Sequence, residues 1–127
     1  MKRLMLLLAL IPCVAGAANW KQVFGDYEYT VSVDADSVQR AKGFARGWVR
    51  QTFSKKRLSG DYAYDSLNGL NSFDCQNKKV SLLQVDVFDG GKQVDSYKPN
   101  AAAGNRPIIP GTVEYFAYRY LCVSKGK

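Results

Sequence analysis

The sequence predicts an α+β protein, a six-stranded antiparallel β-sheet with a C-terminal α-helix packed on one face. Short stretches of alternating apolar and polar residues, separated by turn-forming Gly, Asn and Asp, predict the strands. One segment near the C-terminus has helical periodicity, and a helix with a single apolar stripe needs a sheet face on which to bury it. Two cysteines, Cys75 and Cys122, fall in the fourth strand and at the end of that helix.

The expected strands cover residues 19–24, 27–33, 43–57, 70–76, 80–88 and 92–98. Between residues 27 and 33, tyrosine and valine alternate with polar residues, which is typical of a half-buried strand. In residues 80–88, Leu83, Val85 and Val87 are expected on one face and Leu82 on the other. Asp89-Gly90-Gly91 has the composition of a hairpin turn. We expect one helical turn from about residue 36 to 42, and loops at 58–69 and 99–110.

The helix is expected to begin after Pro110-Gly111. Thr112 can cap its first turn, and Glu114 lies near the positive end of the helix dipole. The apolar stripe has helical spacing and consists of Val113, Phe116, Ala117, Tyr120 and Leu121.

Residues 1–17 have the pattern of a secretory signal peptide: a basic start, a short apolar run and the small residues Ala15-Gly16-Ala17. The apolar run is shorter than the ~20 residues that span a bilayer. Lipidation at Cys13 is the less favoured alternative, because Pro12 precedes that cysteine. Cleavage leaves residues 18–127, which suit one domain. We therefore expect an exported protein, in the periplasm or at the cell surface or outer membrane.

Cys75 and Cys122 are the two cysteines of the mature chain. Two cysteines in an exported domain usually form a disulfide. The chain-entropy model gives about 4 kcal/mol for a bridge that closes so long a loop. A free or metal-bound pair is the alternative.

The chain has no histidine, which excludes histidine-based catalytic triads and most zinc and copper sites. No glycine-rich loop lies between a strand and a helix to hold a phosphate. We therefore expect no catalytic residue, no metal, no cofactor and no enzyme activity. The formal net charge of +7 permits contact with polyanions, but a solvated basic surface explains it equally.

The candidate binding surface combines cations with an aromatic residue, a mixture suited to nucleic acid or sulfated glycans through charge contacts and stacking. It consists of Arg46, Trp48, Arg50, Lys55, Lys56 and Arg57. The structural alternative is that Trp48 is buried under the helix or in an interface, with the arginines packed around it. Nucleic acid is not an expected partner for an exported protein.

Tyrosines provide a second candidate for partner binding, because exposed tyrosines are favoured at protein interfaces. Two lie in the expected loop and two on the expected outer face of the helix: Tyr62, Tyr64, Tyr115 and Tyr118. Packing between helix and sheet explains some of them equally well.

The order of several short motifs resembles the surface-adhesin protein E family of Gram-negative bacteria. The matching pieces are Trp20, the segment from Tyr29 to Val38, Gly47-Trp48-Val49, Asn71-Ser-Phe-Asp-Cys75, the hairpin at Gly91, and Ile108-Ile-Pro-Gly-Thr112 leading to Cys122. The resemblance covers nearly all of the mature chain.

This resemblance implies a six-stranded sheet with a C-terminal helix, a surface or outer-membrane location, and homodimers as one available state. It also implies adhesion to host proteins such as laminin, vitronectin or plasminogen. The leading hypothesis is a non-enzymatic exported binding protein of this type. The alternative is a periplasmic partner or inhibitor protein, for example one that blocks a lysozyme.

Overall fold

A computed structural model describes residues 18–100 and 104–123. The predicted signal peptide, with Cys13, lies outside these residues. The strands are β1 (Trp20–Gly25), β2 (Tyr29–Asp34), β3 (Gln39–Ala41), β4 (Phe44–Ser59), β5 (Tyr62–Asp74), β6 (Lys79–Asp89), β7 (Lys92–Tyr97) and β8 (Arg106–Pro107). A 3-10 turn, Ala35–Ser37, follows β2, and α1 (Val113–Tyr118) continues into a π-helical turn, Arg119–Val123. Among the described residues, no helix has both the length and the apolar character needed to cross a membrane.

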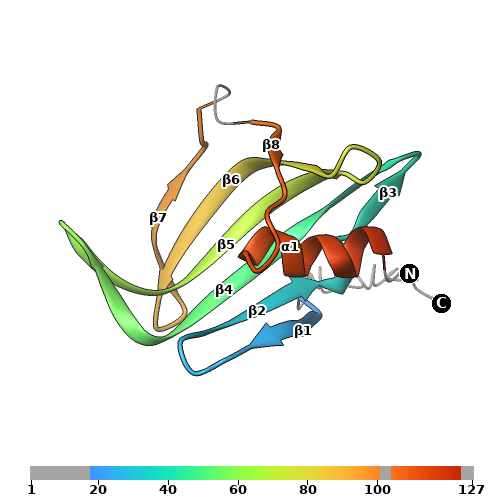
Figure 1. Ribbon diagram of the computed structural model, residues 1–127. Coiled ribbons are helices and arrows are strands. Elements are labelled where there is room, and N and C mark those ends of the chain that lie inside the picture. Colours follow the sequence, from blue (N-terminus) through green and yellow to red (C-terminus); the bar gives the residue numbers. More distant parts are fainter. Residues whose placement is uncertain (1–17, 101–103, 124–127) are drawn as a thin grey trace, which may run out of the picture.

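The main strands form one antiparallel sheet in the order β1-β2-β4-β5-β6-β7, with α1 lying against one face (Figure 1). This arrangement confirms the predicted fold class. Two short strands join the sheet outside that order: β3 pairs with β4, and β8 pairs with the start of β6. Because each long strand neighbours the next one in the sequence, hairpins account for most of the pairing.

The prediction of a loop at 58–69 is wrong. β4 runs on to Ser59, β5 begins at Tyr62, and a tight turn at Gly60 and Asp61 joins them. Turn-forming residues dominate this segment locally, but both strands have partners along their length, and pairing outweighs weak local propensity. The result is a long hairpin that projects from one end of the sheet (Figure 1).

Two smaller expectations also fail. The helical turn expected to reach residue 42 ends at Ser37, and β3 follows it. In β6, the pairing shifts between Leu70 and Asn71 of β5, which face Gln84 and Leu82. The extra residue, Leu83, is therefore a β-bulge, and it places Leu82 on the same face as Val85. A simple period of two could not reveal that bulge.

Helix α1 begins as the sequence predicts. The Thr112 hydroxyl oxygen accepts a hydrogen bond from the Tyr115 N–H at 3.3 Å, so it caps the first turn. The predicted apolar stripe packs on the sheet: Ala117 and Leu121 are fully buried, and the other members are partly buried against the core. The helix lies mainly over β1, β2 and β4, reaches β5 through the Tyr118 ring, and lies away from β7 (Figure 1).

The core lies between α1 and the sheet. Its largest fully buried side chain is Phe73 of β5, and the rest comprises Val31, Val33, Ala45, Val49, Val80, Ala117 and Leu121. Phe24 of β1 stacks on Phe116 of α1, with ring centroids 3.9 Å apart.

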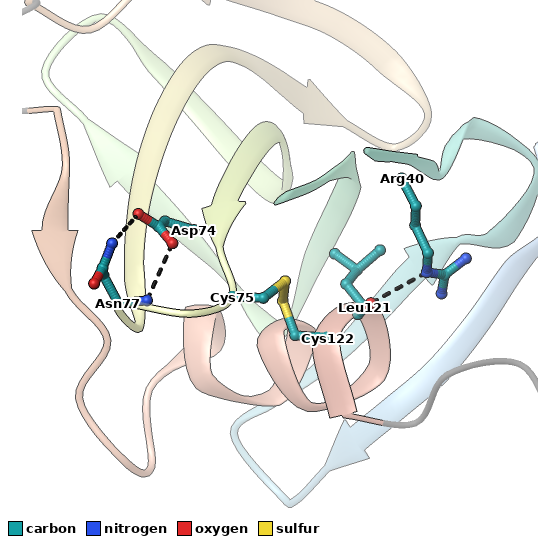
Figure 2. Close-up of a disulfide and its surroundings, with 6 residues drawn as sticks. All are labelled: Arg40, Asp74, Cys75, Asn77, Leu121 and Cys122. Carbon is teal, nitrogen blue, oxygen red and sulfur yellow. Dashed lines mark hydrogen bonds between the residues drawn. A yellow bond between two sulfur atoms is a disulfide. The ribbon is translucent and has the colours of Figure 1, made fainter. Parts of the chain in front are cut away.

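A disulfide joins Cys75, just after β5, to Cys122 in the π-helical turn (Figure 2). The predicted pairing is thereby confirmed. Beside it, the Arg40 Nε–H donates to the Leu121 carbonyl oxygen at 3.2 Å (Figure 2). This bond satisfies one of the carbonyl groups that a helix C-terminus leaves without a partner. Two contacts, one covalent, therefore fix the end of the helix to the sheet.

Asp74, at the turn before β6, should make the free energy of unfolding depend on pH. The Asp74 carboxylate accepts hydrogen bonds from the Asn77 side-chain amide at 2.8 Å and from the Asn77 backbone N–H at 3.1 Å (Figure 2). These bonds hold the pKa of Asp74 below its ordinary value. Because the pKa of Asp74 is lower in the folded protein than in the unfolded chain, its ionised carboxylate stabilises the fold at pH values above the unfolded pKa of about 3.9. This stabilisation is lost as the pH falls through the folded-state pKa.

We therefore expect Asp74→Asn to be less stable than the native protein at pH 7, with a smaller difference at about pH 3. Urea unfolding of both proteins at each pH measures this. Asp36→Asn, which alters an exposed acid, serves as the control. A difference that stays constant between the two pH values would contradict the assignment.

Candidate partner-binding surface

Three predicted site residues lie together on the sheet face that the helix does not cover. In β4, Ala45 and Val49 are buried toward α1, so the alternating residues Arg46, Trp48 and Arg50 point to the opposite side. Their partners across the ladder in β5 are Ser72, Leu70 and Asn68, respectively. Trp48 is therefore not under the helix, which excludes one half of the structural alternative.

Arg50 is at the centre of this surface. Its Nε–H donates to Asn68 Oδ1 at 2.8 Å, and its guanidinium carbon lies 4.1 Å from the centre of the Trp20 ring. The Phe88 ring is on its other side, at 6.0 Å. Burial lowers the pKa of Arg50, an effect that the Asp34 carboxylate opposes, and a guanidinium in this setting keeps its charge.

The terminal nitrogens of Arg50 remain available. Within the described part of the chain, no residue accepts a hydrogen bond from them. A planar guanidinium stacked on an indole ring is oriented in advance, so little side-chain entropy is lost when it binds a carboxylate. The geometry suits recognition of an acidic group on a partner.

We call this surface the helix-free face and define it by seven side chains. They are Trp20 of β1, Arg46, Trp48 and Arg50 of β4, Asn68 and Leu70 of β5, and Phe88 of β6. Both tryptophans are half-buried, and neither belongs to the core cluster. An aromatic, arginine-containing surface without a covering layer has the composition of a protein interface rather than of an ordinary solvated sheet.

The other three predicted residues lie elsewhere, on the projecting hairpin. Lys56 Nζ forms an ion pair with Asp89 Oδ1 at 2.7 Å, where the β6–β7 turn meets the hairpin. The Arg57 guanidinium stacks on Phe53, 4.2 Å from its ring centre, and Lys55 is exposed. Two of the three cations thus make contacts within the molecule, and the run does not extend the helix-free face.

The four tyrosines divide between packing and surface. The Tyr118 ring lies against the core, 6.4 Å from the centre of the Phe73 ring, and Tyr115 contacts Phe116. On the projecting hairpin, the Tyr62 hydroxyl donates to Asp95 Oδ2 at 2.8 Å, a bond that raises the pKa of Tyr62. Tyr118 is therefore a packing residue, contrary to its expected place on the outer helix face.

Sequence reasoning missed Trp20, Asn68, Leu70 and Phe88 as members of the surface. Asn68 was not predicted as a surface residue of a strand, because its segment has the composition of a loop. Trp20 and Phe88 lie in predicted strands, and strand alternation marks their faces, but only the register across β1, β2, β4, β5 and β6 brings them next to Arg50.

Among the described residues, no three histidine, cysteine or acidic side chains gather in a way that would hold a metal ion. The geometry thus defines a disulfide-bonded α+β module with an uncovered aromatic and cationic sheet face.

The model of the surface-adhesin protein E family matches residues 20–123, so this chain belongs to that family. Membership in a family of surface adhesins indicates an exported protein with protein partners. No curated protein sequence matches the chain significantly.

Proposed function

We propose that the protein is an exported, non-enzymatic adhesin that binds host extracellular-matrix or plasma proteins through its helix-free face. The observation that carries this proposal is Arg50, held between Trp20 and Phe88 with its terminal nitrogens available to a partner. Tryptophan and arginine are the residues that most often dominate binding energy at protein interfaces. Laminin, vitronectin and plasminogen are the ligands that the family resemblance favours.

Removal of residues 1–17 as a signal peptide would deliver residues 18–127 to the periplasm or the cell surface. Mass spectrometry of the mature N-terminus tests this step, since an N-terminus at residue 18 is expected and a retained Met1 would contradict it.

We also propose that the helix-free face pairs with a second copy when no ligand is bound. Self-pairing of one patch gives the symmetric homodimer most common among soluble proteins.

The adhesin proposal predicts a large loss of binding from changes on the helix-free face. Arg46→Glu combined with Trp48→Ser should weaken saturable binding to immobilised laminin, vitronectin or plasminogen about thirtyfold, equal to about 2 kcal/mol. The cause is the loss of an aromatic anchor and the reversal of a neighbouring charge. Solid-phase binding of residues 18–127 measures the effect.

The projecting hairpin supplies the matched control. Lys55→Glu combined with Lys56→Glu and Arg57→Glu reverses three charges away from the helix-free face, and we expect a smaller loss of binding. A larger loss from the hairpin variant would move the site there. Absence of saturable binding to all three ligands would contradict the adhesin role, and a lysozyme inhibition assay on the same protein should then show whether turnover is blocked.

A further inference from the structure

A second concave site lies on the opposite face, beside the start of α1. It is a cleft of about 460 Å³, at the place where the sheet extends beyond the helix. Residues from β2, β4, β5, β6 and β7 form its floor and one side, and residues 111–114 form the other side. The helix makes most of its sheet contacts with β1, β2 and β4 and reaches β5 through Tyr118 and the disulfide, so the β7 edge of the sheet lies beyond it (Figure 1).

The floor of the cleft is apolar and deepened by a glycine. Val49 and Val85 are almost fully buried there, and Leu82 joins them because of the bulge in β6. A Cβ at Gly69 would lie 3.0 Å from Leu82 Cδ1 and 3.4 Å from Asn71 Nδ2. The floor therefore stays open because position 69 has no side chain, and it suits a slender aliphatic chain.

Two polar groups that line the cleft, the Asn71 side-chain oxygen and the Glu114 carboxylate, can accept hydrogen bonds from a ligand. Asn71 is 5% exposed; its amide nitrogen donates to the Gly69 carbonyl at 3.1 Å, and no donor among the described residues reaches its Oδ1. This oxygen is not itself buried from solvent, so it is available to accept a hydrogen bond from a ligand. Among the described residues that line the cleft, Glu114 alone is charged, in a chain of net charge +7.

The Glu114 carboxylate is only weakly engaged within the molecule. In the described part of the chain, its ionic contact is with Arg106 Nη2 at 3.8 Å, and both side chains are partly exposed. Two aromatic rings, Tyr29 and Tyr97, also line the cleft, and Tyr97 is half-exposed at its mouth. Aromatic faces beside a carboxylate attract cations.

We propose that this cleft receives a basic side chain, lysine or arginine, from a protein partner. The methylene groups lie on the apolar floor, and the ammonium or guanidinium group donates to Glu114 and Asn71 beside the tyrosine rings. This site is independent of the helix-free face, and it requires a partner with a basic segment rather than an acidic one. The protein then has two faces with opposite charge preferences.

Amide-detected NMR titration of residues 18–127 with Nα-acetyl-lysine amide and Nα-acetyl-arginine amide tests the proposal. Resonances of Gly69, Asn71 and Tyr97 should shift, and Glu114→Gln should weaken the binding about tenfold, the effect of losing one charge-assisted hydrogen bond. Arg106→Gln should strengthen it, because the competing internal cation is gone. Asp61→Asn changes the charge equally on an exposed turn and should have no effect.

Several outcomes would overturn the proposal. Equal binding of the neutral Nα-acetyl-norleucine amide would make the cleft a purely apolar pocket. Equal binding of n-butylammonium would make it a site for free amines rather than for a partner's side chain. Shifts elsewhere in the spectrum, or no shift with either basic probe, would also contradict it. Binding by the double variant Arg46→Glu, Trp48→Ser should stay intact, which separates this site from the helix-free face.

Discussion

Replacing Phe73 with alanine should lower the free energy of unfolding by about 3–5 kcal/mol, the largest loss expected from any single side chain here. Phe73 is fully buried in the central strand β5 and pairs with Ala45 on one side and Val80 on the other. Its ring also reaches the Tyr118 ring of α1. Truncation would remove the contacts that seat the helix and leave a cavity that rigid strands cannot close.

Urea unfolding of the oxidised protein at pH 7 measures this loss. Phe73→Leu should cost less than Phe73→Ala, because most of the volume remains. Leu58→Ala offers a matched control, since Leu58 is 85% exposed on the projecting hairpin, and its change should stay within about 0.5 kcal/mol. If Phe73→Ala behaved like Leu58→Ala, the core would not lie where the structure places it.

Replacing both Cys75 and Cys122 with serine should cost about 4 kcal/mol. The bridge spans 47 residues of sequence, from β5 to the end of the helix, so its loss restores much freedom to the unfolded chain. Such a loss is a large share of the 5–15 kcal/mol that is typical of folded proteins. The double variant leaves no unpaired thiol that could form dimers through a new disulfide.

Comparison with the reduced native protein checks the assignment. Reduction by dithiothreitol should lower the midpoint of urea unfolding as far as the double serine variant does, and should have no effect on that variant. A variant as stable as the oxidised protein would mean that the bridge adds nothing beyond the contact between Arg40 and Leu121.

Local signals predicted much of this fold. The alternation in residues 27–33 gave β2, the stripe from Val113 to Leu121 gave the helix and its buried side, and Thr112 gave its cap. These features depend on neighbours within a few residues, so the sequence carries them directly.

Long-range pairing explains what was missed. The segment 58–69 became strand because β4 and β6 provide partners for its backbone, and the bulge at Leu83 turned Leu82 toward the cleft. The candidate surface was half predicted: Arg46, Trp48 and Arg50 share a face by alternation alone. Trp20 and Phe88 join them through strand register, which no short window of sequence contains.

The central claim is that the helix-free face binds the protein's partner. Trp20 and Trp48, the two tryptophans of the chain, both lie on that face. Their oxidation by hydroxyl radicals therefore reports directly on its accessibility. Tyr27, which is 86% exposed in the turn between β1 and β2, provides an internal reference outside the face.

Hydroxyl-radical footprinting with peptide mass spectrometry, on residues 18–127 alone and with saturating laminin, vitronectin or plasminogen, makes the decisive comparison. We expect oxidation of Trp20 and Trp48 to fall in the complex while that of Tyr27 is unchanged. Protection that grows with protein concentration in the absence of ligand would assign the same face to the homodimer. Saturable binding with both tryptophans as reactive as in the free protein would contradict the account.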